Sequence, residues 1–181
     1  MKIGVISDTH HHLPSVRKAI QIFREHQVEM VVHGGDWVAP FVPQFINGLK
    51  PSLDCPIHSV FGNNDGDVYL MLQMNRSLGW GIEFHKEIFE MAAGGKQISV
   101  YHGTESLITD ALIRCQKVDA VFTGHTHLAL NKKTNDTIHL NPGTTSFIRG
   151  TQTLDEATVA IYDTAHNAAE IVRWTRKEVE P

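Results

Sequence analysis

The chain has 181 residues, of which 41% are hydrophobic, 20% charged and 8% aromatic, and its formal net charge is −4 at pH 7. This length fits one domain with a sizeable core, so we expect a single domain over residues 1–181. The acidic balance, with a pI of about 6.3, lacks the basic footprint with which nucleic-acid-binding proteins neutralise phosphates.

Cysteine usage and hydropathy indicate the compartment. Cys55 and Cys115 show neither metal-type spacing nor a disulfide framework, which favours a reducing cytoplasm. The N-terminal apolar run is too short for a signal peptide, and no segment approaches a membrane span in length. We therefore expect a cytoplasmic protein with no membrane partner.

The predicted elements alternate between strands, which are short apolar runs, and helices, which show amphipathic periodicity. In chain order we expect a strand over 2–7, a helix over 13–26, a strand over 29–34, a helix over 40–49, a strand over 56–62, a helix over 67–78, antiparallel strands over 82–84 and 87–103, a helix over 105–116, a strand over 119–124, and hairpins over 128–143 and 158–174. The expected turns are at Gly94–Gly95 and near Asn135–Asp136. This order predicts an α/β fold, a four-layer sandwich of two mixed β-sheets flanked by helices.

The stretch TGHTH places His125 and His127 just after the predicted strand over 119–124. Residues two apart in an extended segment share a face, so both side chains could simply cover a strand end. Converging imidazole nitrogens also make metal sites. The stretch alone does not decide between these interpretations.

Further candidate donors follow four other predicted strands at their carboxyl ends, where open α/β sheets place ligand sites. They are Asp8 and His10, Asp36, Asn63, and His102. Each has a plainer interpretation, since Asp36 could cap a helix, Asn63 could occupy a turn and His102 could satisfy a strand end. The same arrangement in five segments favours one shared site.

The donor types indicate what such a site would hold. Carboxylate, amide and imidazole groups without a thiolate suit first-row divalent ions better than a sulfur-rich structural zinc. Seven side chains exceed the needs of one ion but fit two ions if one carboxylate bridges them. Such pairs lie about 3.5–4 Å apart and clamp the attacking and leaving oxygens of an in-line displacement at phosphorus.

These residues resemble the ordered motifs of the calcineurin-like metallophosphoesterases over about residues 1–150. The motifs are Asp8-Thr9-His10, Gly35-Asp36, Gly62-Asn63-Asn64-Asp65, His102-Gly103 and Gly124-His125-Thr126-His127. Asn141-Pro142-Gly143-Thr144 is similar to a loop of the small microbial phosphodiesterase branch, which is related to the metallophosphoesterase-fold subunit of retromer.

The resemblance implies a metal-dependent phosphodiesterase acting on a small phosphodiester. Asp8, His10 and His127 would hold one ion, Asn63, His102 and His125 the second, and Asp36 would bridge them. Asp36, Asn63 and His102 would also be catalytic, with a hydroxide between the ions attacking phosphorus. Mn²⁺ is the favoured ion, with Fe²⁺, Ni²⁺, Zn²⁺ and Co²⁺ as alternatives. The alternative function is a metal-binding scaffold for protein partners. The oligomeric state stays open, with a homo-oligomer as one alternative.

Two positions depart from the family pattern. Asn64 stands where many members carry a histidine that assists the leaving group, and an amide is no Brønsted acid near neutral pH. His11, followed by His12, stands where glycine is common, and either is a candidate substitute acid. Arg149 matches a basic position that contacts phosphate, so Asn64, His11 and Arg149 are the substrate-binding candidates. The other histidines are interpreted as structural or surface residues: His26, His33, His58, His85, His139 and His166.

Overall fold

The computed structural model describes residues 1–49 and 53–180. Its helices are α1 (Leu13–Glu25), α2 (Phe41–Gly48), α3 (Val68–Leu78), α4 (Ser106–Arg114) and the 3₁₀ turn η1 (Arg176–Glu178). Its strands are β1 (Lys2–Ile6), β2 (Met30–His33), β3 (Ile57–Ser59), β4 (Ile82–Phe84), β5 (Ile88–Ala93), β6 (Lys96–Tyr101), β7 (Ala120–Phe122), β8 (Ala129–Thr134), β9 (Thr137–Pro142), β10 (Ile148–Arg149), β11 (Gln152–Thr153), β12 (Glu156–Asp163) and β13 (Ala168–Thr175).

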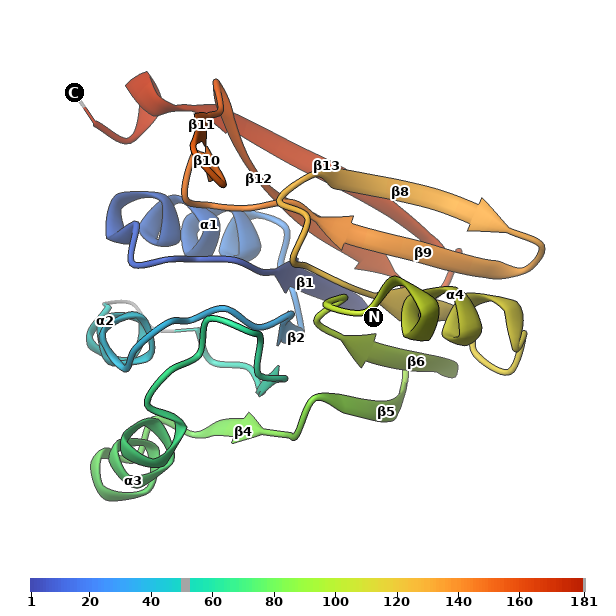
Figure 1. The fold of residues 1–181 in the computed structure, drawn as a ribbon, viewed down its shortest axis with the longest axis horizontal. Coiled ribbons are helices and arrows are strands. Elements are labelled where there is room, and N and C mark those ends of the chain that lie inside the picture. The colour runs from blue at the N-terminus through green and yellow to red at the C-terminus, as the bar shows by residue number, and fades with distance from the viewer. Residues whose placement is uncertain (50–52, 181) are drawn as a thin grey trace.

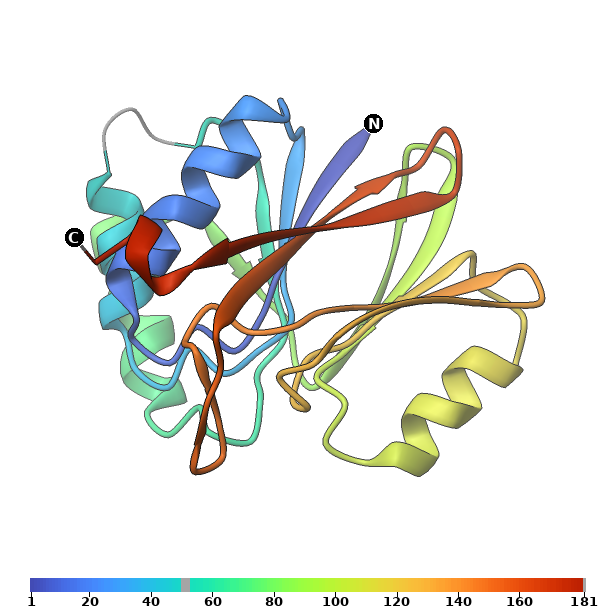
Figure 2. The ribbon, with the colours of Figure 1, turned by 90° about the horizontal axis from the view of Figure 1, so that it is seen from above.

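Two mixed sheets form the centre of the molecule. The six-stranded sheet has the order β13-β12-β1-β2-β3-β4, in which β1 to β4 run parallel and the β12–β13 hairpin runs antiparallel. The five-stranded sheet has the order β5-β6-β7-β9-β8, with β6, β7 and β9 parallel and a hairpin partner at each edge. Helices α1 to α3 cover the outer face of the first sheet, and α4 lies outside the second (Figures 1 and 2). The predicted four-layer sandwich is confirmed.

Alternation along the strands builds two apolar cores. In β1, Ile3 and Val5 belong to the core between the sheets, whereas Ile6 belongs to the core under helices α1 to α3. Gly4 faces the same helices, and a Cβ there would lie 2.7 Å from the Phe23 ring of α1. The glycine therefore allows α1 to pack closely on the sheet.

The strand over 82–84 differs from its expected antiparallel setting. It is β4, which pairs in parallel with β3, with Ile57 opposite Ile82. Helix α3 lies between β3 and β4 in the chain, and a helical crossover returns the chain in the same direction. The sequence also gave no indication of the short β10–β11 hairpin or of η1.

The turns form as expected. Gly94 and Gly95 join β5 to β6 with φ values of 54° and 78°, the left-handed backbone that a two-residue hairpin turn needs. Asn135, with φ of 53°, begins the turn between β8 and β9.

Among the described residues, no helix is both long and apolar enough to cross a membrane. The assignment of residues 1–181 to a single domain stays a prediction.

Candidate metal centre

The seven predicted donors gather where β1, β2, β3, β6 and β7 end. Asp8 and His10 follow β1, Asp36 follows β2, Asn63 follows β3, His102 follows β6, and His125 and His127 follow β7. Segments more than a hundred residues apart in the chain meet there, because the carboxylate of Asp8 accepts the backbone N–H of His125 at 3.0 and 3.2 Å.

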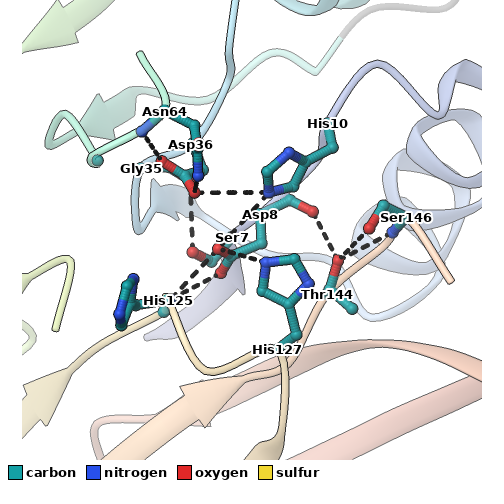
Figure 3. A network of polar contacts seen from close by, with 12 residues as sticks. Ser7, Asp8, His10, Gly35, Asp36, Asn64, His125, His127, Thr144 and Ser146 are labelled. Atoms are coloured by element: carbon teal, nitrogen blue, oxygen red, sulfur yellow. Dashed lines mark hydrogen bonds and ion pairs between the residues drawn. The ribbon is translucent and has the colours of Figure 1, made fainter. Parts of the chain in front are cut away.

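One group of donors surrounds Asp8. Single ligand atoms of Asp8, His10, Asp36 and His127 all lie within 4.8 Å of one another. Nε2 of His127 is 3.2 Å from Oδ1 of Asp8. Nε2 of His10 is 3.5 Å from Oδ2 of Asp36 and 4.0 Å from Oδ1 of Asp8. Figure 3 shows these side chains converging on one point.

A second group surrounds Asn63. Its Oδ1 lies 2.8 Å from Nδ1 of His125 and 3.1 Å from Nε2 of His102. The same His102 nitrogen is 3.5 Å from Oδ2 of Asp36. Asp36 is therefore the carboxylate that reaches both groups, the position that the sequence assigned to a bridge.

The chemistry of the cluster fits divalent cations. The carboxylates of Asp8 and Asp36 are almost fully buried, and buried anions need compensating positive charge. Nε2 of His10 is buried and has no hydrogen-bond partner, although a lone pair there could bind an ion. The donors are oxygen and nitrogen atoms, which suits first-row divalent metals.

Backbone carbonyls orient two of the imidazoles. Nδ1–H of His102 donates to the carbonyl oxygen of Gly34 at 2.7 Å, and Nδ1–H of His127 donates to the carbonyl of Ile148. A carbonyl can only accept, so Nδ1 of each ring carries the proton of that bond, and Nε2 is the nitrogen directed at the cluster. This arrangement is the usual support for metal-binding histidines.

Electrostatics keeps Asp36 ionised. Burial by itself raises the pKa of its carboxyl group, but the contacts with His10 and His102 and the hydrogen bonds from Asn64 outweigh burial and hold the pKa well below its usual value. Burial lowers the pKa of His102 and of His127, and their contacts with Asp36 and Asp8 respectively more than reverse this, so both pKa values are raised. The cluster therefore favours positive charge beside its two carboxylates.

The donor loops have unusual backbone conformations. The φ angles of five donors are positive: 53° at Asp8, 38° at His10, 62° at Asp36, 66° at His125 and 59° at His127. Non-glycine residues rarely adopt this region, and such residues cluster at functional sites.

A glycine allows two of the donor loops to meet. A Cβ at Gly62 would collide with Oδ1 of Asp36 and would lie 2.8 Å from Cε1 of His102. Glycine therefore lets the loop after β3 approach the carboxylate closely.

Comparison with known proteins agrees with this geometry. The family model described as the calcineurin-like phosphoesterase superfamily domain matches residues 1–167. The chain belongs to this superfamily. It is 32% identical over 143 residues to a phosphodiesterase of Methanocaldococcus jannaschii, which covers 79% of this chain and 83% of that protein.

Two solved structures have a fold similar to that of this chain. The structure of an archaeal phosphodiesterase has a TM-score of 0.83 at 29% identity and covers 96% of this chain and all of that one (100%). The zinc complex of Vps29 from Entamoeba histolytica has a TM-score of 0.65 at 17% identity and covers 97% of this chain and 99% of that one. At that lower identity the second likeness shows the fold alone. The resemblance seen in the sequence is confirmed at the level of the superfamily and the fold.

Two residues within the superfamily motifs support the donors, although the sequence assigned them no role. The carboxylate of Asp65 accepts the N–H groups of Asp36, Val38 and Gly62 at 3.1, 2.7 and 2.7 Å. These bonds join the loops after β2 and β3. Burial raises the pKa of Asp65, although these N–H groups lower it. Membership of the motif was the signal that could have found Asp65.

Asn141 supports the loop that carries His125 and His127. Its Nδ2 donates to the carbonyl of Gly124 at 2.6 Å and to Oγ1 of Thr126 at 3.1 Å, and its Oδ1 accepts the N–H of Gly143 at 2.9 Å. Thr144 then donates to the carbonyl of Asp8 at 2.7 Å (Figure 3). The loop Asn141–Thr144 thus ties β9 to both donor loops.

The substrate-binding candidates occupy three different settings. Asn64 is turned onto Asp36, donating from its backbone N at 2.9 Å and from Nδ2 at 2.7 Å. His11 has a buried Nε2 with no hydrogen-bond partner, and its ring lies edge-on to Phe41. Arg149 is exposed on β10, directly after the residue whose carbonyl binds His127.

Both ring nitrogens of His12 contact residues outside the metal centre. Its Nδ1 accepts the N–H of Ser15 at the start of α1, and its Nε2 lies 2.7 Å from a carboxylate oxygen of Glu180. Of the three consecutive histidines, His10 enters the cluster, His11 has a free nitrogen, and His12 caps a helix. His11 is therefore the stronger candidate for a substitute acid.

A cavity of about 840 Å³ opens beside the second donor group. Asn63 and His102 line one part of it, and Lys86 lines another. The remaining lining combines the apolar or aromatic side chains of Phe61, Val68, Ile88, Tyr101 and Ile108 with Thr104 and the carboxylates of Asp65, Glu87 and Glu105. A cavity with apolar side chains and several polar groups is typical of a small-molecule site.

Proposed function

We propose that the protein is a dinuclear-metal phosphodiesterase that hydrolyses P–O bonds in small phosphodiesters. The observation that carries this proposal is the position of Asp36, whose Oδ2 lies 3.5 Å from both His10 and His102 and so belongs to both donor groups. In this proposal Asp8, His10 and His127 hold one ion, Asn63, His102 and His125 hold the other, and Asp36 bridges them.

Two divalent ions in these positions would supply a nucleophile that is active at neutral pH and a clamp for the attacking and leaving oxygens. The chain holds the donors in place. The carbonyls of Gly34 and Ile148 fix the rings of His102 and His127, and Asn64 fixes the orientation of the Asp36 carboxylate. Such prior positioning avoids reorganisation during the reaction.

The cavity beside Asn63 and His102 indicates where an organic substituent binds. Its apolar side chains favour a diester with an aromatic or apolar group over a compact, fully charged monoester. Lys86 adds a positive charge to the cavity wall for a second anionic group, beside the carboxylates of Glu87 and Glu105. His11 and Arg149 are the further contacts that we propose for substrate.

Mn²⁺ is the ion we propose, and the four imidazoles and three carboxylate or amide oxygens suit first-row divalent metals as a class. Fe²⁺, Ni²⁺, Zn²⁺ and Co²⁺ remain alternatives that the same donors accept. Cys55 and Cys115 are both free thiols, which agrees with the proposed cytoplasmic setting.

Metal reconstitution tests the proposal. Metal-stripped protein is assayed with an activated aryl phosphodiester while each divalent ion is added back in turn, and bound metal is counted by elemental analysis. We expect activity to return as two ions per chain bind at the donor groups around Asp36, counted as the difference in metal content between the parent and Asp36→Asn. The control is His166→Gln, which removes an exposed histidine paired with Asp163 and should behave as the parent.

Two results would overturn the proposal. A ceiling of one ion, with His102 and His125 replaceable without loss, would remove the dinuclear centre. Two tightly bound ions without turnover on any diester would favour the scaffold function instead.

A further inference from the structure

A second histidine cluster lies on adjacent strands at the edge of the six-stranded sheet. Nδ1 of His58 is 3.2 Å from Nε2 of His85. Glu83 places one carboxylate oxygen 3.4 Å from the His58 nitrogen and the other 3.7 Å from the His85 nitrogen. Single ligand atoms of the three residues all lie within 4.8 Å of one another. The cluster shares no residue with the candidate metal centre.

We propose that His58, Glu83 and His85 bind a further divalent ion of the zinc class. A tetrahedral zinc ion with bonds of about 2.0–2.1 Å to nitrogen and oxygen holds its donor atoms about 3.3–3.4 Å apart. The two imidazole nitrogens are 3.2 Å apart, and Nδ1 of His58 is 3.4 Å from one Glu83 oxygen, both close to that spacing. Nε2 of His85 is 3.7 Å from the other Glu83 oxygen, so a rotation of the exposed Glu83 side chain would bring one oxygen to both nitrogens.

Regular strand pairing builds this arrangement. His58 and Glu83 stand opposite each other in the parallel register of β3 and β4. The N–H of His85 donates to the carbonyl of Ser59 at 2.7 Å, which continues the pairing beyond β4. The His85 ring also stacks on Phe89 of β5, with centroids 3.8 Å apart and planes 8° apart. Backbone pairing and ring stacking thus hold both imidazoles in place.

The donor chemistry selects the kind of ion. Two imidazole nitrogens and one carboxylate suit Zn²⁺, Ni²⁺ or Cu²⁺ better than Mg²⁺ or Ca²⁺, which prefer oxygen ligands.

The site is open on one side. The side chains of His58 and His85 are 17% and 22% exposed, whereas Glu83 is 65% exposed. Three protein ligands leave a fourth position for water. Because β4 is the last strand of its sheet, an ion there would join an edge strand to its neighbour and stabilise the edge.

Zinc binding by variants of the full chain tests this site. Each protein is stripped of metal, dialysed against buffered free Zn²⁺ and analysed for zinc per chain. Glu83→Ala removes an exposed carboxylate, and His85→Phe keeps a ring against Phe89 while removing its nitrogens. We expect each variant to bind one zinc ion fewer than the parent, and the zinc-dependent rise in Tm to shrink in both. His26→Gln is the matched control, because His26 lies 3.1 Å from Glu170 away from both clusters.

The outcomes separate this proposal from the dinuclear centre. The same measurement in an Asp36→Asn background should still show the loss of one ion when Glu83→Ala is added. Equal zinc content in the parent, Glu83→Ala and His85→Phe would overturn the proposal and would show that the two imidazoles only share a hydrogen bond. An equal loss in His26→Gln would also overturn it, because any surface histidine would then bind zinc.

Discussion

The two histidine clusters are built on different kinds of backbone. In the candidate metal centre, five donors have positive φ, and the carboxylates of Asp8 and Asp36 are buried. In the edge cluster, His58 and Glu83 occupy paired strands, and the carboxylate of Glu83 faces solvent. Left-handed non-glycine residues cost about 1–3 kcal/mol each, so many contacts must hold the first arrangement.

This difference indicates how each cluster responds to change. Asp65, Asn141 and Thr144 all hold loops of the metal centre, so the loss of one such contact alters donors on several strands. The edge cluster depends on the pairing of β3 with β4, which does not need the side chains of its donors. We therefore expect substitutions in the metal centre to lower catalytic activity. Substitutions in the edge cluster should change only the zinc content and the stability of the protein.

The largest expected effect is that of Asp36→Asn. This change removes the charge that both donor groups share, and we expect metal affinity to fall at both positions. A metal centre contributes several kcal/mol of charge stabilisation, so kcat/KM should fall about 10³-fold or more. The measurements are kcat/KM on an aryl diester, metal content and circular dichroism. Asp163→Asn, which removes a carboxylate paired with His166, is the control. Unchanged turnover in Asp36→Asn would mean that the bridge is misassigned.

A smaller effect is expected at Asn64. An amide cannot protonate a departing oxygen, and general-acid assistance is worth about 10²–10⁴-fold. The parent should therefore prefer aryl or otherwise activated diesters and act weakly on alkyl phosphomonoesters. Asn64→His should raise the ratio of kcat/KM on alkyl esters to kcat/KM on aryl esters by about 10²-fold, because the added imidazole can donate a proton. The lost hydrogen bond to Asp36 should affect both esters alike. The measurement is the dependence of kcat/KM on the pKa of the leaving group.

The loop of three histidines supplies the controls for that experiment. His11 has an unpartnered Nε2, whereas both nitrogens of His12 have partners. A shallow dependence in the parent that stays unchanged in Asn64→His and steepens in His11→Ala would show that His11 is the acid. His12→Ala should leave the dependence as it is in the parent.

The next largest effect is that of Asn141→Ala. It distinguishes the loss of support for the donor loops from a general loss of stability. Asn141→Ala leaves the N–H of Gly143 without its partner and removes one of two bonds to the carbonyl of Gly124, which keeps the N–H of Thr126 at 2.8 Å. Unsatisfied buried groups cost about 1–3 kcal/mol, and lost support of a metal ligand costs about 10–100-fold in activity. Asn75→Ala is the matched control, because Asn75 bridges the N–H and the carbonyl of Ile82 in the same manner away from the centre. Denaturant unfolding and kcat/KM are measured for both variants.

The control variant, Asn75→Ala, should lose stability but keep the kcat/KM of the parent. If both variants lost activity in proportion to stability, Asn141 would have no specific role in holding the donors.

Periodicity was sufficient to predict most of the fold. The four α-helices begin and end within two residues of their expected limits, because each has a clear apolar face or a clear boundary. Asp67 caps the start of α3, for example, and Gly79 ends it with φ of 64°. The β10–β11 hairpin was missed because its strands have two residues each and Ile148 is exposed, so no alternation marks them. The direction of β4 was missed because apolar alternation is the same in parallel and antiparallel strands.

Strand ends and motifs predicted that seven candidate donors share one site, and the structure brings them together, whereas their metal-binding roles stay a prediction. Their separations and orientations depend on backbone contacts that no side-chain pattern records. The bond from His102 to the carbonyl of Gly34 joins residues 68 positions apart in the chain. The pairing of His58 with Glu83 likewise needs the parallel register of β3 and β4, so single histidines in separate segments had no visible partner.

The smallest expected effect is that of Lys86→Met, which tests the cavity at the border of the centre. Lys86 is exposed and lines the cavity together with Asn63 and His102, so it can meet an anionic substituent of the substrate without contacting the donors. Exposed charge pairs contribute little, and KM for a diester with a second anionic group should rise by less than about fivefold, with kcat unchanged. A diester with a neutral aromatic substituent should show no change in KM. Lys132→Met, which removes an exposed lysine from β8, is the control for net charge. Equal increases in KM for both diesters, or the same increase in Lys132→Met, would show that Lys86 acts only through the overall charge. A rise confined to the anionic diester and to Lys86→Met would place its second charged group in this cavity.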